Sequence, residues 1–114
     1  MKKNKLDDNL LDYIPEKNDE LRWEEDEGVV LFVENRGWAN FIAQKFFHRP
    51  RFSQIHLDEM GSFIWRIIDG NRSIYDISIL VKEEFGDNAE PLYNRLVQYM
   101  RTLEAYSFIK FKNR

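Results

Sequence analysis

Apolar residues recur at helical spacing over the centre of the chain. Between Asp58 and Gly70, positions i, i+3, i+4, i+7 and i+8 are all apolar, namely Met60, Phe63, Ile64, Ile67 and Ile68. This is the complete pattern of an amphipathic helix. Asp58 suits the N-cap and Gly70 suits the stop, so the sequence predicts a helix between these two residues.

Two further helices follow. The segment "SIYD", from Ser73 to Asp76, has the spacing of a capping box with Asp in place of the usual Glu. A second helix therefore starts there and runs to Gly86, with Ile77, Leu80, Val81 and Phe85 facing inward. The third helix covers "AEPLYNRLVQYMRTLEAY", where Pro91 lies near the start and its missing N–H costs little.

The third helix carries two apolar stripes. The main stripe consists of Leu92, Leu96, Tyr99, Leu103 and Tyr106, and the second consists of Tyr93, Val97 and Met100. A helix that packs on one side needs only one stripe. The second stripe is therefore either covered by the sheet or left exposed as a binding surface, and the sequence alone leaves both interpretations open.

Strand patterns lie on either side of these helices. In "LRWEEDEGVVLFVEN" two β-prone segments flank a short loop with Gly28, which predicts a hairpin. "RFSQIHL" predicts a third strand, in which Ser53, Ile55 and Leu57 share one face. We expect Ile55 and Leu57 to face the core. The last segment, "SFIKFK", predicts a short strand or an extended tail.

Between the second and third strands, "WANFIAQKFFHRP" predicts a short extra helix, from Trp38 to Phe47. The order of elements then favours an α+β fold of winged-helix type. It has a small antiparallel three-stranded sheet, a three-helix bundle and the extra helix inserted before the third strand. At 114 residues the chain has room for one domain, which we place at residues 21–114. Residues 1–20 are predicted to be a flexible tail, or one that docks through a small apolar group at Leu10, Leu11, Tyr13 and Ile14.

Composition excludes several classes of protein. There is no cysteine, so disulfides, thiolate nucleophiles and cysteine-ligated metals are excluded. The net charge of −3, with both signs interspersed, makes nucleic acid an unlikely ligand. No segment has the apolar length of a signal peptide core or of a membrane span. We therefore expect a cytoplasmic protein that does not bind membranes.

Catalytic patterns are missing as well. Only His48 and His56 are available as histidine ligands or bases, and they lie on either side of Pro50. The five glycines never come close together as in a phosphate-binding loop, and no serine lies in a nucleophile elbow. The sequence therefore disfavours an enzyme, and predicts neither a metal site nor a cofactor.

Three features favour binding, and each has an ordinary alternative. They are the second stripe of the third helix, the strand of residues 52–57, whose edge could accept another chain's strand, and a basic cluster that could attract an acidic peptide. That cluster consists of Lys45, His48, Arg49 and Arg51. The alternatives are a covered stripe, a strand with mixed faces and a solvated loop.

One long stretch resembles a known family. "IHLDEMGSFIWRIIDGNRSIYDISILVKEEFG", followed by a helix that ends in "LEAYSFIKF", is similar to the PqqD-like proteins, the precursor-peptide recognition elements of ribosomally synthesised, post-translationally modified peptides. The positions that match the family pattern are Leu57, Asp58, Gly61, Ile64, Asp69, Gly70, Ser73, Ile74, Asp76, Ile77, Phe85 and Gly86. The resemblance covers about residues 21–112. The insertion at residues 38–47 departs from the short members of the family.

The resemblance implies a non-catalytic, chaperone-like role. Such proteins bind the leader of a precursor peptide as an extra antiparallel strand and present it to a modifying enzyme, often a radical S-adenosylmethionine protein. Carried over to this chain, the strand would be held by the backbone of Phe52, Ser53, Gln54, Ile55, His56 and Leu57. The groove would be lined by Tyr93, Leu96, Val97 and Met100. To this we add an electrostatic role for Lys45, Arg51 and Arg101 towards acidic leader residues.

Other functions stay open. A winged-helix transcription regulator shares the fold class, but the predicted second helix offers one Lys against three acidic residues in "SIYDISILVKEEFG". A structural adaptor is a third alternative. The free strand edge could also form a homodimer.

Overall fold

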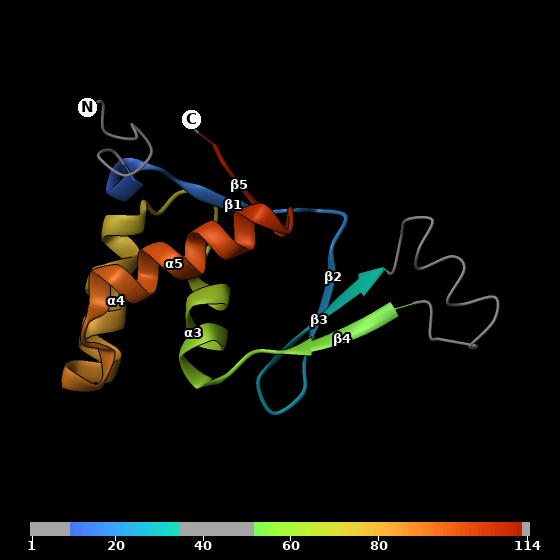
Figure 1. The fold of residues 1–114 in the computed structure, drawn as a ribbon, viewed down its shortest axis with the longest axis horizontal. Helices are drawn as coiled ribbons and strands as arrows, with labels where there is room; N and C mark the ends of the chain where they lie inside the picture. Colours follow the sequence, from blue (N-terminus) through green and yellow to red (C-terminus); the bar gives the residue numbers. More distant parts are fainter. Residues whose placement is uncertain (1–9, 35–51, 113–114) are drawn as a thin grey trace.

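The computed structural model describes residues 10–34 and 52–112. Over these residues the protein is an α+β domain with three α-helices and two small antiparallel sheets (Figure 1). The elements follow in the order η1 (Leu10–Asp12), β1 (Pro15–Lys17), β2 (Arg22–Glu25), β3 (Val29–Glu34), β4 (Phe52–His56), α3 (Glu59–Ile67), α4 (Ile74–Phe85), η2 (Gly86–Ala89), α5 (Leu92–Ala105) and β5 (Ile109–Phe111). The predicted short helix at 38–47, and with it Lys45 and Arg51, lies outside the described residues.

The larger sheet has the strand order β2-β3-β4, and Figure 1 shows it extending away from the helices. The predicted hairpin is confirmed, because β2 and β3 pair antiparallel across a turn at Glu27 and Gly28. Both turn residues have positive φ, 54° and 117°, which explains the glycine. The predicted third strand is found as β4, which pairs with β3 from Phe52 opposite Glu34 to His56 opposite Val30.

The helix boundaries follow from local capping. The Asp58 side chain accepts a hydrogen bond from the backbone N–H of Gly61 (2.7 Å), which fixes the start of α3. At the start of α4 both halves of the capping box between Ser73 and Asp76 are formed. These boundaries are the ones that the sequence predicts, because each cap lies within three residues of the group it satisfies.

The core lies between the three helices and one face of β3. It is closed by Trp65 of α3, by Val29 and Leu31 of β3 and by a line of α5 residues. Members of that line are Leu92, Leu96, Met100 and Leu103.

The structure shows how far each apolar stripe of α5 is covered. In the second stripe Met100 is 0% exposed, which is the covered alternative, whereas Tyr93 is 53% exposed. One assignment to the main stripe is wrong. Tyr106 was assigned to the main stripe, but it is 67% exposed. The reason is that α5 ends at Ala105, so Tyr106 is the C-cap and no longer follows the helical repeat.

A prediction about β4 is also wrong. Ile55 was expected in the core, but 37% of its surface is exposed. It lies directly opposite the fully buried Leu31 of β3. Because β4 is the outer strand, β3 takes the central place against the helices and leaves Ile55 at the margin. Leu57 is half-buried and does pack against the core, as predicted.

The two ends of the described chain meet in the second sheet. β1 pairs antiparallel with β5, from Pro15 opposite Phe111 to Lys17 opposite Ile109, and the two strands lie side by side in Figure 1. The predicted terminal strand is thus confirmed. Just before β1, the Leu10 side chain is buried in the core. The division of the chain at residue 20 stays a prediction.

A buried serine joins α3 to the larger sheet. The hydroxyl of Ser62 accepts a hydrogen bond from the N–H of Val29 (2.9 Å) and donates one to the carbonyl of Leu57 (3.2 Å). Beside it, the N–H of Leu57 donates to the carbonyl of Val29 (2.9 Å). The Ser62 hydroxyl therefore bridges the Val29 N–H and the Leu57 carbonyl, which would otherwise bond directly to each other as the next pair of the β3–β4 ladder. This bridge fixes α3 at the end of β4.

We predict that Ser62→Ala lowers the free energy of unfolding by about 1–3 kcal/mol, because it leaves the N–H of Val29 buried without an acceptor. Ser78→Ala is the matched control. Ser78 is equally buried, but its hydroxyl donates only to the Tyr75 carbonyl of its own helix. Urea unfolding of both variants measures the difference, and equal losses would contradict the role given to Ser62.

Candidate functional site

One edge of β4 offers backbone groups for a further strand. Hydrogen bonds alternate along an antiparallel pair. Since the N–H of Leu57 bonds to Val29 of β3, the register turns the N–H and carbonyl groups of Phe52, Gln54 and His56 away from β3. Among the described strands, none pairs with this edge of β4. Residues 53–56 are also exposed.

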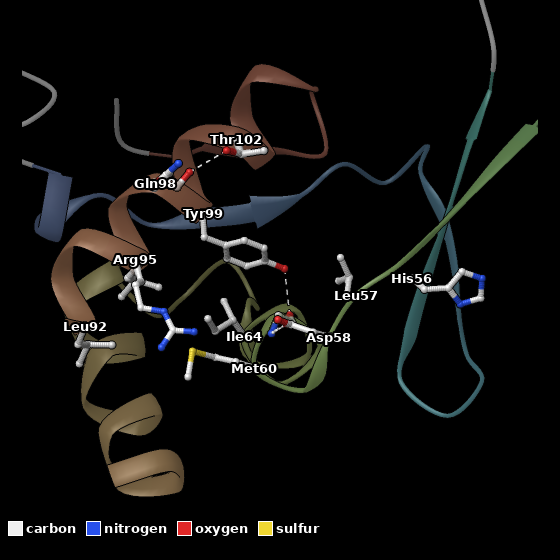
Figure 2. A pocket seen from close by; sticks show the side chains of 12 residues that line it. His56, Leu57, Asp58, Met60, Ile64, Leu92, Arg95, Gln98, Tyr99 and Thr102 are labelled. Atoms are coloured by element: carbon white, nitrogen blue, oxygen red, sulfur yellow. Dashed lines mark hydrogen bonds between the residues drawn. The ribbon is translucent and has the colours of Figure 1, made fainter. Parts of the chain in front are cut away.

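A groove of about 540 Å³ adjoins the end of this strand (Figure 2). It lies between the end of β4, α3 and α5. Its lining consists of His56, Leu57, Asp58, Met60, Gly61, Ile64, Leu92, Arg95, Leu96, Gln98, Tyr99 and Thr102. We call it the α3–α5 groove.

The floor of the α3–α5 groove is apolar. It is formed by the outer atoms of three buried core residues, Ile64, Leu92 and Leu96, together with the half-buried Met60. The rim is polar, with Arg95 held by a hydrogen bond from Nη1 to the carbonyl of Asn88 (2.9 Å). An apolar floor with a polar rim can hold an apolar side chain while the backbone that carries it stays hydrated.

Tyr99 and Gly61 set the width of the groove. The Tyr99 hydroxyl donates to the carbonyl of Gly61 (3.0 Å), and Figure 2 shows the ring reaching from α5 towards α3. A Cβ on Gly61 would come within 2.9 Å of Asp58 Oδ1 and 3.3 Å of the Tyr99 hydroxyl. A glycine is therefore needed for α5 to approach α3 this closely.

The environment of Tyr99 changes its acidity. Burial of the side chain, and after it the negative charge of Asp58, raises the pKa of Tyr99 well above its ordinary value. Both causes disfavour the phenolate. Tyr99 therefore remains a hydrogen-bond donor to Gly61 well into the alkaline range.

A second hollow, of about 710 Å³, lies on another face of α5 and includes Tyr93, Val97, Arg101 and Tyr106. The groove residues predicted from the sequence are thus divided. Leu96 lines the α3–α5 groove with His56 and Leu57, whereas Tyr93, Val97 and Arg101 line the second hollow. Met100 lines neither, because it is fully buried. Roles in binding stay predictions for all of these residues.

Several residues of the groove were absent from the predicted site. The sequence pattern places Met60 and Tyr99 in apolar stripes and does not single out Arg95. Tyr99 follows Leu96 and Arg95 by one helical turn, which puts the three side chains on neighbouring positions of one face. This spacing indicates a groove only once α3 is known to lie opposite that face.

Other kinds of site are not formed by the described part of the chain. Over residues 10–34 and 52–112, no three His, Asp or Glu side chains come together in a way that could hold a metal ion. Within the same residues, no helix has the length and apolar character needed to cross a membrane.

A free strand edge beside an apolar groove is typical of domains that bind an extended peptide by strand addition. A family described as "Coenzyme PQQ synthesis protein D (PqqD)" matches residues 27–109, most of the chain. The protein belongs to the PqqD family, as the sequence resemblance predicts. No curated protein and no solved structure matches the chain.

We predict that Tyr99→Phe lowers the free energy of unfolding by about 0.5–1.5 kcal/mol near neutral pH, because the hydrogen bond to Gly61 is lost. A tyrosine in an unfolded chain ionises near pH 10, whereas folded Tyr99 keeps its proton. The native protein therefore loses stability as the pH rises above about 10, and Tyr99→Phe lacks this loss.

Urea unfolding at about pH 8 and about pH 11 measures both effects, because the difference between the two proteins should shrink at the higher pH. Tyr75→Phe, at an exposed position of α4, is the control and should behave as the wild type at both values. A difference that stays constant with pH would contradict the raised pKa of Tyr99.

Proposed function

We propose that the protein is a non-catalytic peptide-binding module. It binds the leader region of a ribosomally made precursor peptide as a further strand along β4, and presents the peptide to a modifying enzyme such as a radical S-adenosylmethionine protein. The observation that carries the proposal is the edge of β4, with which no strand of residues 10–34 and 52–112 pairs, beside the α3–α5 groove. Membership of the PqqD family supports it.

The proposal is energetically consistent. Gln54 and His56 each offer one N–H and one carbonyl, which is enough for four ladder bonds. At about 1 kcal/mol net for each bond, and about 2 kcal/mol for each of two buried apolar anchors, the gross gain is near 8 kcal/mol. Ordering a flexible peptide removes several kcal/mol, which leaves about 4–6 kcal/mol net and a Kd between about 40 μM and about 1 mM. Such binding allows the peptide to be released after modification.

The wider setting follows from the same proposal. The module acts in the cytoplasm, where precursor peptides are made, and needs no cofactor. The three helices and the β2-β3-β4 sheet form a winged-helix-like domain that begins near residue 21. The β4 edge is occupied by peptide, and pairing of two copies through this edge would compete with that binding.

The function is tested by titrating the protein with leader peptides encoded next to its gene, and by following the backbone amide signals in solution. Saturable shifts at residues 52–57 and at the groove residues of α3 and α5 are expected. Saturable binding with shifts confined to other surfaces would contradict strand addition. Salt-dependent binding to duplex DNA would favour a transcription regulator in its place.

We predict that Gln54→Pro weakens leader binding by at least about fivefold, because proline removes an N–H from the free edge of β4 and places its ring there. The ladder to β3 should persist, since proline is tolerated where the N–H faces away from the sheet. Gln54→Ala is the matched control: it removes the same side chain, keeps the N–H, and should bind as the wild type. If Gln54→Pro folds and binds as well as Gln54→Ala, the backbone edge is not the binding element.

A further inference from the structure

We propose that the α3–α5 groove selects its peptide by the order of three side chains. The peptide carries an acidic residue, then an apolar residue two positions later, then a second apolar residue two positions after that, read from its amino end. This inference rests on the proposed strand addition along β4, taken as antiparallel, and adds to it a chemical code.

The apolar spacing follows from the alternation of the sheet. Side chains directly opposite each other in an antiparallel pair share a face. The two peptide residues opposite Ile55 and Leu57 therefore point to the same face as these side chains. They are two positions apart in the peptide, as Ile55 and Leu57 are in β4 and its extension. Leu57 lines the groove and Ile55 is a large apolar side chain left partly exposed at the margin of the core. Apolar peptide residues at i and i+2 would cover both.

The direction follows from the antiparallel pairing. β4 runs from Phe52 to His56 and then, through Leu57, into α3. A peptide that runs the other way meets Leu57 first and Ile55 afterwards. Residues before the one opposite Leu57 must therefore extend along the groove, away from His56. Figure 2 shows Arg95 at that far end, beyond Tyr99 as seen from His56.

Charge then decides which side chain fits at each end. The guanidinium of Arg95 is oriented by its hydrogen bond to the Asn88 carbonyl (2.9 Å), and a guanidinium carries five N–H donors suited to a carboxylate. Asp58 contributes the negative charge of its carboxylate to the same groove, nearer to Leu57. An acidic peptide residue is thus repelled near Asp58 and attracted near Arg95. We place it two residues, or about 7 Å, before the first apolar residue, because that is the next peptide position on the same face of the strand.

The test uses two synthetic nine-residue peptides with blocked ends and the same composition. One contains Glu-Thr-Leu-Thr-Val and the other contains Val-Thr-Leu-Thr-Glu, each between Thr residues. Binding to the full chain is followed by the amide signals of Gln54 and His56. The first peptide should bind about two- to fivefold more tightly at low salt, and the difference should shrink at high salt, as for an exposed ion pair.

Variants of Arg95 test whether its guanidinium is the group that attracts the acidic peptide residue. With Arg95→Glu the preference should disappear, and it should return when Lys replaces Glu in the first peptide. Arg95→Lys should keep part of the preference, because the positive charge is retained while the paired N–H donors of the guanidinium are lost. Arg22→Glu makes the same change of charge on β2, at the opposite edge of the sheet, and should leave the preference unchanged.

The outcomes separate this inference from the proposed function. If both peptides shift the amides of Gln54 and His56 with equal affinity, the code is overturned while strand addition stands. If neither peptide shifts these amides, strand addition fails and the code fails with it. The comparison of the two peptides on the wild-type protein holds even if a variant of Arg95 does not fold.

Discussion

The hydroxyl of Ser62 is the contact on which the candidate site depends. The edge of a strand is useful for binding only if it is held at a fixed position relative to the surface that contacts the peptide side chains. In this protein the hydroxyl of Ser62, a residue of α3, is hydrogen-bonded both to Val29 on β3 and to Leu57 just after β4. The helix is therefore connected to both strands at the point where the sheet ends. Because an unpaired buried N–H is costly, this joint resists shifts of register that would move the β4 edge away from the groove.

A second joint extends from α3 to α5. Tyr99 meets the backbone of Gly61, one residue before Ser62, so α3 is bonded to the sheet and to α5 within two consecutive residues. The first turn of α3 thus fixes the positions of both the β4 edge and α5, the helix on the other side of the groove. Asp58 takes part in both aspects of the site, because its carboxylate caps α3 and also contributes charge to the groove. Structure and recognition therefore rest on the same few residues.

How far the sequence predicts this arrangement depends on how local the cause is. α3, α4 and the hairpin are predicted because caps, turn glycines and periodic apolar residues lie close together in the chain. The pairing of β1 with β5 is not predicted, since two three-residue strands at opposite ends carry no local signal. The error at Ile55 is of another kind: periodicity gives a face, but the neighbouring elements decide how much of that face is covered. Tyr106 differs again, because α5 ends one residue before it. The sequence does not single out Arg95, because an arginine on a helix usually lies on the solvent-exposed surface. Only the position of α3 opposite α5 shows that Arg95 lines a groove.

The β1–β5 sheet has a consequence for how the domain is completed during synthesis. β1 is made before the three helices and β5 after them, yet each is the other's partner in the two-stranded sheet. Until β5 leaves the ribosome, β1 has no ladder and the buried ring of Phe111 is not yet in place beside Tyr13. The helices and the hairpin can assemble earlier, because their contacts are closer in sequence. β5 therefore completes the fold, and deleting residues 109–111 would leave β1 without its pairing partner as well.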